Sequence, residues 1–266
     1  MAKKKDPSVT FLNKFGYNVV KLPRVGIEPM DVVGRDTTTQ WLGPLRSVWK
    51  STVTEPAPSV PHPAVAMSGQ QTDQLDISFG LKILANALAA LGATVPSVDF
   101  AYSRAQKVQF SYTDVTSTVV APLEAGNFLA AGTLNSDNPV VKHYFMDPEA
   151  QAFLIVDVLK SASITVSASD SHGGSVAVDV PSIQGVVGAN VSVKPGAAGN
   201  DSITYTGKVP VTFGFTVDQI EFDGTRWSIS GTAPSGAIAF AAAGSHPAPH
   251  PAAAPILLGT GCRVSI

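Results

Sequence analysis

The side chains that could do chemistry in this chain are few, and their spacing predicts no catalytic or metal site. His246 and His250 are four residues apart, which on a helix would place both on one face, but the prolines between them prevent that helix. His172 lies in the sequence DSHGG, whose Asp, Ser and Gly favour a turn. Nucleophile elbows, phosphate-binding loops, dinucleotide fingerprints and HExxH pairs are absent from the sequence. We therefore expect a protein that is not an enzyme and that uses no cofactor and no metal.

The composition indicates an ordered protein with few charges. Hydrophobic residues make up 44% of the 266 residues and charged residues only 14%, against about a quarter in an average protein. The net charge of −2 hides an asymmetry, since residues 1–50 contain nine Lys and Arg but four Asp and Glu. This basic end suits either nucleic acid or an anionic lipid surface.

Cysteine usage and the N-terminus both favour a cytoplasmic protein. Cys262 is the single cysteine, so no disulfide forms within the chain and a reducing compartment is expected. The first residues, MAKKKDPSVTFLNKFG, are basic but lack the apolar core of a secretory signal. No apolar run reaches the length of a membrane-spanning helix.

An alternating pattern dominates residues 153–223. Apolar residues recur at every second position with Ser and Thr between them, which is the side-chain period of a β-strand. The pattern predicts a half-buried antiparallel sheet, although low-charge strands of this kind are also what transmembrane β-barrels are made of. The apolar positions are Ile164, Val166, Val176, Val178, Val211, Phe213, Phe215 and Val217.

The rest of the chain predicts an α+β fold with a twisted central antiparallel sheet and short connecting helices. The clearest helix is 78–92, where leucines recur at helical spacing and Gly92 ends the pattern. Further helices are expected at 6–16 and 122–132, and a helical turn or loop packed by two tryptophans is expected at 37–53. Strands are expected at 17–22, 31–33, 94–102, 106–121, 139–145 and 225–231.

The C-terminal residues differ in kind from the rest. Residues 244–255 are rich in Pro and Ala and uncharged, which predicts an extended linker. The tail 256–266 is apolar, so docking onto the domain would remove its side chains from water. Its apolar residues are Ile256, Leu257, Leu258, Val264 and Ile266.

In this order the chain resembles the bacterial gasdermins. The resemblance rests on the basic amphipathic N-terminal helix followed by GYNVVKLPRVGIEPMDVVG, and on the internal helix before a set of strands. It rests further on two alternating hairpin regions, SITVSASDSHGGSVAVDV and ITYTGKVPVTFGFTVDQIEFDG, and on the short tail behind a linker. It implies a gasdermin-like pore-forming domain at 1–243, a cleavable linker at 244–255 and an autoinhibitory tail at 256–266.

The resemblance also implies a mechanism. The chain would be an autoinhibited monomer in the cytoplasm until a protease, encoded nearby, cuts the linker and the tail leaves. The two hairpins would then lengthen into membrane-spanning strands, and a homo-oligomer would form a pore in the inner membrane that kills the cell as an antiphage defence. We expect no nucleic-acid partner; membrane contact is assigned to Lys3, Lys4, Lys5, Leu12 and Lys14. The linker positions open to cleavage are Gly244, Ser245, His246, Pro247, Ala248, Pro249, His250 and Pro251.

Two features qualify the resemblance, and one other class of protein stays open. Many bacterial gasdermins carry an acylated cysteine near the N-terminus, whereas positions 2–5 here are Ala-Lys-Lys-Lys, so no acylation is expected. Asp is absent from 224–266, which excludes cleavage after Asp within the linker. The alternative is a structural or assembly β-protein, such as a phage or capsid component, that uses the same strands as a static sandwich.

Overall fold

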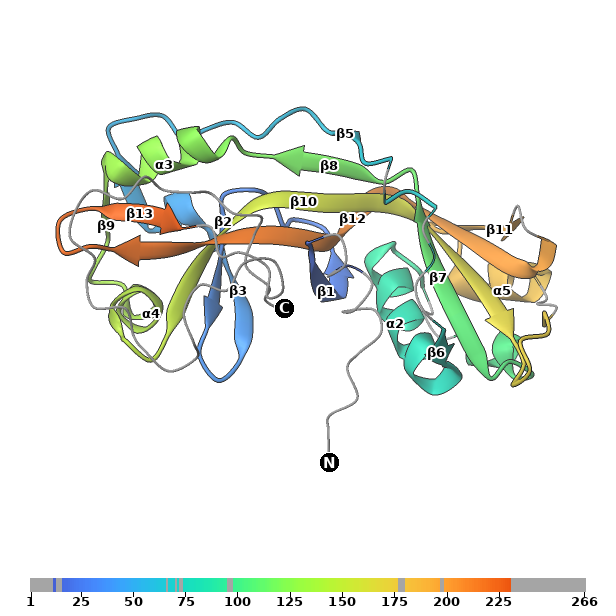
Figure 1. The fold of residues 1–266 in the computed structure, drawn as a ribbon. Coiled ribbons are helices and arrows are strands. Elements are labelled where there is room, and N and C mark those ends of the chain that lie inside the picture. Colours follow the sequence, from blue (N-terminus) through green and yellow to red (C-terminus); the bar gives the residue numbers. More distant parts are fainter. Residues whose placement is uncertain are drawn as a thin grey trace.

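Two long antiparallel strands run through the whole molecule and organise it (Figure 1). The computed structural model describes residue 12 and residues 16–65, 67–69, 71, 74–94, 98–176, 180–196 and 199–230. Strand β10 (Gln151–Ser169) pairs with β12 (Gly199–Phe222), from Ala152 opposite Ile220 to Ser167 opposite Ser202. We call this pair the β10·β12 ladder.

Short strands pair along both outer edges of the β10·β12 ladder. On the β10 side these are β2 (Asp31–Arg35), β8 (Thr116–Val119) and β7 (Lys107–Thr113). On the β12 side they are β13 (Trp227–Ser230), β1 (Asn18–Arg24) and β11 (Ser192–Gly196). Further out lie β3 (Thr39–Pro44), β5 (His62–Pro63) and β6 (Leu75–Asp76), and a separate small sheet pairs β4 (Trp49–Ser51) with β9 (Gly132–Leu134).

The ladder changes direction where its register is broken. Between the pairs Ser161–Val211 and Ser163–Thr206, the single residue Ala162 lies opposite the four residues 207–210 of β12. Bulges of this kind bend a strand and increase its twist. The bend is visible in Figure 1 at the point where β8 gives way to β7.

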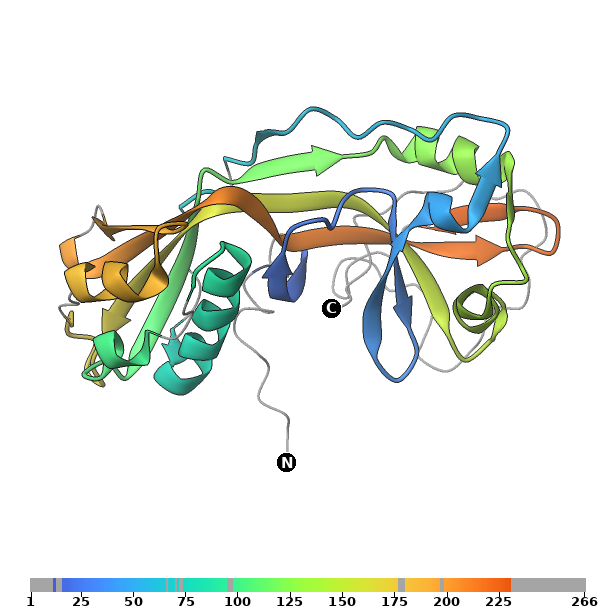
Figure 2. The ribbon, with the colours of Figure 1, turned by 180° about the vertical axis from the view of Figure 1, so that it is seen from behind.

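Helices cover the two ends of the ladder (Figure 2). At one end α2 (Ile77–Ala90) and α5 (Val180–Val187) pack on the hydrophobic cluster that contains Ile164, Val166 and Val211. At the other end lie α3 (Pro122–Ala130), α4 (Pro139–Val141) and the π-helical segment η3 (Lys142–Met146). Each end therefore has its own apolar core, and further buried clusters lie between them.

The structure confirms the α+β fold with a central antiparallel sheet. The helices predicted at 78–92 and 122–132 form α2 and α3. The strand predicted at 106–121 forms as β7 and β8, separated at Asp114, whose φ of 52° is left-handed. Of the helix predicted at 6–16, only Leu12 and Gly16 lie within the described residues.

Three local predictions are wrong. The strand expected at 139–145 is helical, because Pro139 suits a first helical turn and the Asn138 side chain accepts a hydrogen bond from the Val140 amide at 2.9 Å. The described part of 94–102 contains a 3₁₀ turn at Asp99–Tyr102 in place of a strand. The segment 37–53, expected as a helical turn or loop, has a helical turn only at Leu45–Ser47 and otherwise forms mainly the strands β3 and β4.

The pairing predicted for the first alternating stretch is also wrong. After β10 the chain turns at Asp170, whose carboxylate accepts hydrogen bonds from the amides of His172 and Gly174, both at 2.8 Å. Among the described residues, the chain after this turn makes one bridge, Ser169 with Ser175, and the Val176 amide donates to the Ala168 carbonyl at 3.2 Å. Helix α5 begins at Val180, and the long partner of β10 is β12.

Candidate functional site

The far half of the ladder, Ser161–Ser169 with 202–207, contains no charged residue. Its polar face carries hydroxyls that pair across the strands, with Thr165 Oγ1 2.8 Å from Thr204 Oγ1. Its other face is buried, with Ile164 and Val166 fully covered by α2 and α5. One face thus carries uncharged hydroxyl groups, and the other is apolar and covered by helices.

Most of the predicted alternating positions are buried in the described structure. Ile164, Val166 and Val211 lie in the core beneath α2 and α5. Phe213 lies in a neighbouring cluster, and Phe215 and Val217 face the middle of the molecule. Val176 packs partly against the first core from outside any strand, and Val178 lies outside the described residues.

Strand β7 extends the far half of the ladder, and after Lys107 at its start it carries no charge. It pairs with β10 from Ser163 opposite Thr113 to Ser169 opposite Lys107. Val108 and Phe110 are buried with the ladder core, while Gln109 and Ser111 are half-buried between them. Its period of two predicted the strand, but not its place beside β10.

A partly buried polar cluster joins the middle of the ladder to the N-terminal part of the chain. The Tyr17 hydroxyl donates to Asp157 Oδ2 at 2.6 Å, and the Ser117 hydroxyl donates to Asp157 Oδ1 at 2.6 Å. Burial, reinforced by the Asp157 carboxylate, raises the pKa of Tyr17 well above its usual value. Beside it Lys160 pairs with Glu28. These contacts join β10 to β8, to the segment before β1 and to the connection between β1 and β2.

Asp218 is a buried carboxylate on β12, opposite Leu154 of β10 and 3% exposed. Within the described part of the chain its carboxylate has no hydrogen bond or ion pair. Burial alone raises the pKa of Asp218 to about 6. The ladder therefore holds an unfavourable charge at neutral pH.

Neither a metal site nor a helical membrane span is visible in these parts of the chain. The described residues contain no group of three or more His, Cys, Asp or Glu placed to hold a metal ion. Among the helices of the same residues, none is long and apolar enough to cross a membrane.

Comparison with known proteins identifies the family. The model of the Bacterial Gasdermin Family matches residues 20–231. The chain belongs to the bacterial gasdermin family. It is 37% identical over 238 residues to gasdermin bGSDM of Vitiosangium sp., covering 89% of this chain and 88% of that one. It is 34% identical over 227 residues to gasdermin bGSDM of Lysobacter enzymogenes, covering 84% and 83%.

A solved gasdermin has the same fold. The bacterial gasdermin from Bradyrhizobium tropiciagri superposes with a TM-score of 0.62 over 85% of this chain and 91% of its own, at 17% sequence identity. Gasdermins are pore-forming proteins and not enzymes, so this chain belongs to a pore-forming family.

The gasdermin's predicted membrane-contact residues lie mostly outside the described part of the chain. These are Lys3, Lys4, Lys5 and Lys14. Leu12 is described and is 3% exposed, packed in a cluster with Met67, Leu159 and Phe213. In this conformation the Leu12 side chain is buried against the ladder, and contact with a membrane would require it to leave this cluster.

The linker at 244–255 and the tail at 256–266 also lie outside the described residues, so their assignment stays a prediction. The described chain ends at Ser230 in β13. Beside this end is a groove of about 680 Å³ lined by Phe145, Met146, Phe222 and Trp227, among others. Met146 and Phe222 are about half exposed there.

Proposed function

We propose that this gasdermin is an autoinhibited monomer that a protease activates by cutting within residues 244–255. Loss of the tail 256–266 then lets the β10·β12 ladder rearrange and many copies assemble into a membrane pore. The observation that carries the proposal is the uncharged far half of the ladder, with hydroxyls on one face and apolar side chains on the other.

The ladder has the length and chemistry that membrane insertion needs. A tilted strand crosses the bilayer core with about nine to eleven residues, and β10 and β12 have 19 and 24. In a closed ring every backbone N–H and C=O is paired, so no polar edge faces lipid. The apolar face around Ile164 and Val166 would then contact acyl chains, and the face with Thr165 and Thr204 would line the water-filled opening.

Docking of the tail supplies enough free energy to hold the chain in its inactive state. A shift of about 5.5 kcal/mol moves a two-state equilibrium from 1:99 to 99:1. Burial of three or four aliphatic side chains, such as Ile256, Leu257 and Leu258, is of that order. A single cut in the linker, which releases the tail, would therefore suffice to shift the equilibrium from the inactive to the active state.

The N-terminal lysines direct the released protein to membranes. Each Lys or Arg near an anionic surface contributes about 1 kcal/mol, and Lys3, Lys4 and Lys5 stand together at this end. We place the chain in the cytoplasm before cleavage and in the inner membrane afterwards, where the homo-oligomeric pore kills the cell as an antiphage defence.

Dye release from liposomes tests the function. A protein ending at Ala243 should empty vesicles that contain anionic lipid, whereas the full chain should leave them intact, and rings should be visible by negative stain. The same truncation should be toxic when expressed. A truncated protein that is folded, harmless and unable to release dye would refute pore formation.

A substitution in the intact tail tests autoinhibition separately. Leu257→Asp combined with Leu258→Asp should undock the tail, because two charges would have to be buried, and should produce leakage without any cut. The matched control is Ser265→Asp, which adds one charge to a polar tail position. An inert double variant beside an active truncation would show that these leucines do not lock the chain.

A further inference from the structure

A groove at the end of the ladder that carries α3 and η3 is lined by side chains from elements that are separate in the sequence. Phe145 and Met146 come from η3, Phe222 ends β12, and Trp227 starts β13. The groove has a volume of about 680 Å³. We call it the β13 groove, because the described chain ends three residues after Trp227, at Ser230 of the same strand.

Ring contacts fix the shape of the β13 groove. The centroid of the Trp227 ring is 4.9 Å from that of Phe222 and 5.9 Å from that of Phe145. The Trp227 ring also meets the buried Trp49 ring edge-on at 5.8 Å. Edge-to-face ring pairs, such as those with Phe145 and Trp49, are favourable beyond the area that they bury. The groove is therefore formed before anything binds to it.

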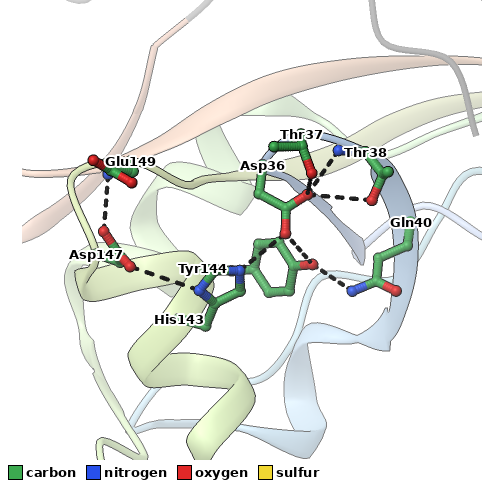
Figure 3. A network of polar contacts seen from close by, with 8 residues as sticks. All are labelled: Asp36, Thr37, Thr38, Gln40, His143, Tyr144, Asp147 and Glu149. Atoms are coloured by element: carbon green, nitrogen blue, oxygen red, sulfur yellow. Dashed lines mark hydrogen bonds and ion pairs between the residues drawn. The ribbon is translucent and has the colours of Figure 1, made fainter.

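A polar network holds η3, which supplies one wall of the groove (Figure 3). His143 Nε2 lies 3.0 Å from Asp36 Oδ2, and the Tyr144 hydroxyl donates to the same oxygen at 3.3 Å. The Tyr144 ring packs where a side chain at Gly34 would lie, since a Cβ there would be 2.6 Å from the ring. The next two residues of η3 line the groove, so these contacts also fix its wall.

The β13 groove exposes apolar surface to water. Met146 and Phe222 are each about half exposed, although their side chains are large and apolar. Contiguous exposed apolar surface marks a site of interaction. An occupant with apolar side chains would remove this surface from water and stabilise the chain.

The segment that follows β13 has the composition of such an occupant. Residues 231–243 read GTAPSGAIAFAAA and carry no charge. In 233–236, APSG, proline stands second and glycine fourth, which is the preference of a type I turn. Beyond that turn one alanine separates Ile238 from Phe240, so in an extended chain both side chains point to the same side. A turn at 233–236 would send these two side chains back along β13 towards Trp227.

Chain length favours this segment over the C-terminal tail. Ser230 lies three residues from Trp227, which is about 10 Å along a strand. Ile238 follows Ser230 by eight residues, a reach of up to about 27 Å, whereas Ile256 follows it by 26 residues. Because the effective concentration of a tethered group falls with about the 3/2 power of the length, it is about sixfold higher for Ile238 than for Ile256.

We infer that residues 236–241 fold back beside β13 and seat Ile238 and Phe240 in the β13 groove. Because this segment precedes the linker at 244–255, it stays in place after a cut in that linker. It fixes the point at which the linker leaves the domain, at the end that carries α3 and η3. The inference holds whether or not the cleaved chain forms pores.

Photocrosslinking identifies the occupant of the groove. Phe240 is replaced by benzoylphenylalanine, an aromatic amino acid whose excited ketone inserts into the C–H bonds that it touches. Mass spectrometry of the irradiated full chain, and of the protein that ends at Ala243, should find adducts within 145–148 or 222–227. The same group in place of His246, in the linker of the full chain, is the control and should give no adduct there.

A further protein carries benzoylphenylalanine in place of Leu257 and decides between the segment and the tail. Groove adducts from position 257 with none from position 240 would assign the groove to the tail and overturn the inference. Adducts from position 240 that join two copies of the chain would assign the groove to a second molecule. A folded protein without any groove adduct from position 240 would refute docking.

Proteolysis after Phe240 gives an independent measure of docking. Chymotrypsin should cut this bond at least about tenfold faster in Met146→Glu than in the unchanged chain, because docking would desolvate the new carboxylate. Met146 is half exposed, so this variant should fold. Phe100→Glu is the matched control, since Phe100 is also half exposed but lies in the 3₁₀ turn beside the core at the other end of the molecule. Its cleavage rate should equal that of the unchanged chain, and an equal rate in Met146→Glu would contradict docking.

Discussion

The two halves of the β10·β12 ladder share one pairing but differ in chemistry. The far half, Ser161–Ser169 with 202–207, has no charge and faces hydroxyl against hydroxyl. The near half, 151–160 with 211–222, contains Asp157, which is bonded to Tyr17, and Asp218, which is buried and has no hydrogen bond or ion pair to another described residue. Moving a charge from its partners into lipid is costly, whereas Ser and Thr are tolerated. We therefore expect the far half to insert and the near half to stay in water.

The largest effect should come from a charge on the apolar face of the far half. Val166→Asp places an unpaired carboxylate in the core beneath α2, and the free energy of unfolding should fall by roughly 4 kcal/mol. In the protein that ends at Ala243, Val166→Asp should also abolish dye release, because position 166 would face lipid in the pore. Chemical denaturation and liposome leakage measure the two effects.

Thr165→Asp is the control for this charge, one residue away on the hydroxyl face. It should cost no more than about 1 kcal/mol and preserve leakage, because that face stays hydrated. Equal damage by Thr165→Asp and Val166→Asp would contradict the assignment of the two faces.

The next effect should come from Asp218 in the near half. Because its pKa is about 6 when folded and 3.8 in the reference state, the folded chain binds this proton more tightly. Stability from this group is therefore full at pH values below about 4 and is lost as pH rises through about 6. Asp218→Asn should raise the free energy of unfolding by about 2–3 kcal/mol at pH 7 and by little at pH 4.

Denaturation of both proteins at pH 4, 5, 6 and 7 measures this difference. Asp223→Asn is the matched control, since that carboxylate is bonded to the Arg226 and Thr225 amides in an exposed turn, and its loss should not stabilise the chain. A constant difference between Asp218→Asn and wild type across the series would show that the carboxylate is not desolvated.

The smallest effect should come from the hydrogen bonds to Asp157 at the middle of the ladder. Tyr17→Phe removes the hydroxyl that donates to Asp157 and should cost about 1–2 kcal/mol. Combined with Ser117→Ala in a double-mutant cycle, the losses should not add, because both hydroxyls serve one carboxylate. Strict additivity would show that the two hydrogen bonds act independently.

The sequence predicts the strands of this fold better than it predicts their partners. Alternation identifies Ile164 and Phe213 as strand residues facing a core, because period two is local. It does not reveal that the long partner of β10 is β12, which follows it in the sequence only after the helix α5. The choice depends on contacts across the whole sheet.

The polar part of the site was less accessible to sequence reasoning. Tyr17, Ser117 and Asp157 are separated by up to 140 residues, and only the sheet brings them together. Leu12 reads as a membrane anchor from its lysine neighbours, although it is packed against the ladder in this conformation. Asp218 sits in a strand pattern without any sign of its burial.

The bulge at 207–210 holds extra residues of β12 between the two halves of the ladder. Four residues of β12 lie there opposite one residue of β10, and Gly207 fits because a Cβ would lie 2.8 Å from the Leu91 side chain. If the bulge is drawn straight, β12 gains three residues, or about 10 Å of strand. The far half is thus able to lengthen while every pair in the near half keeps its present register.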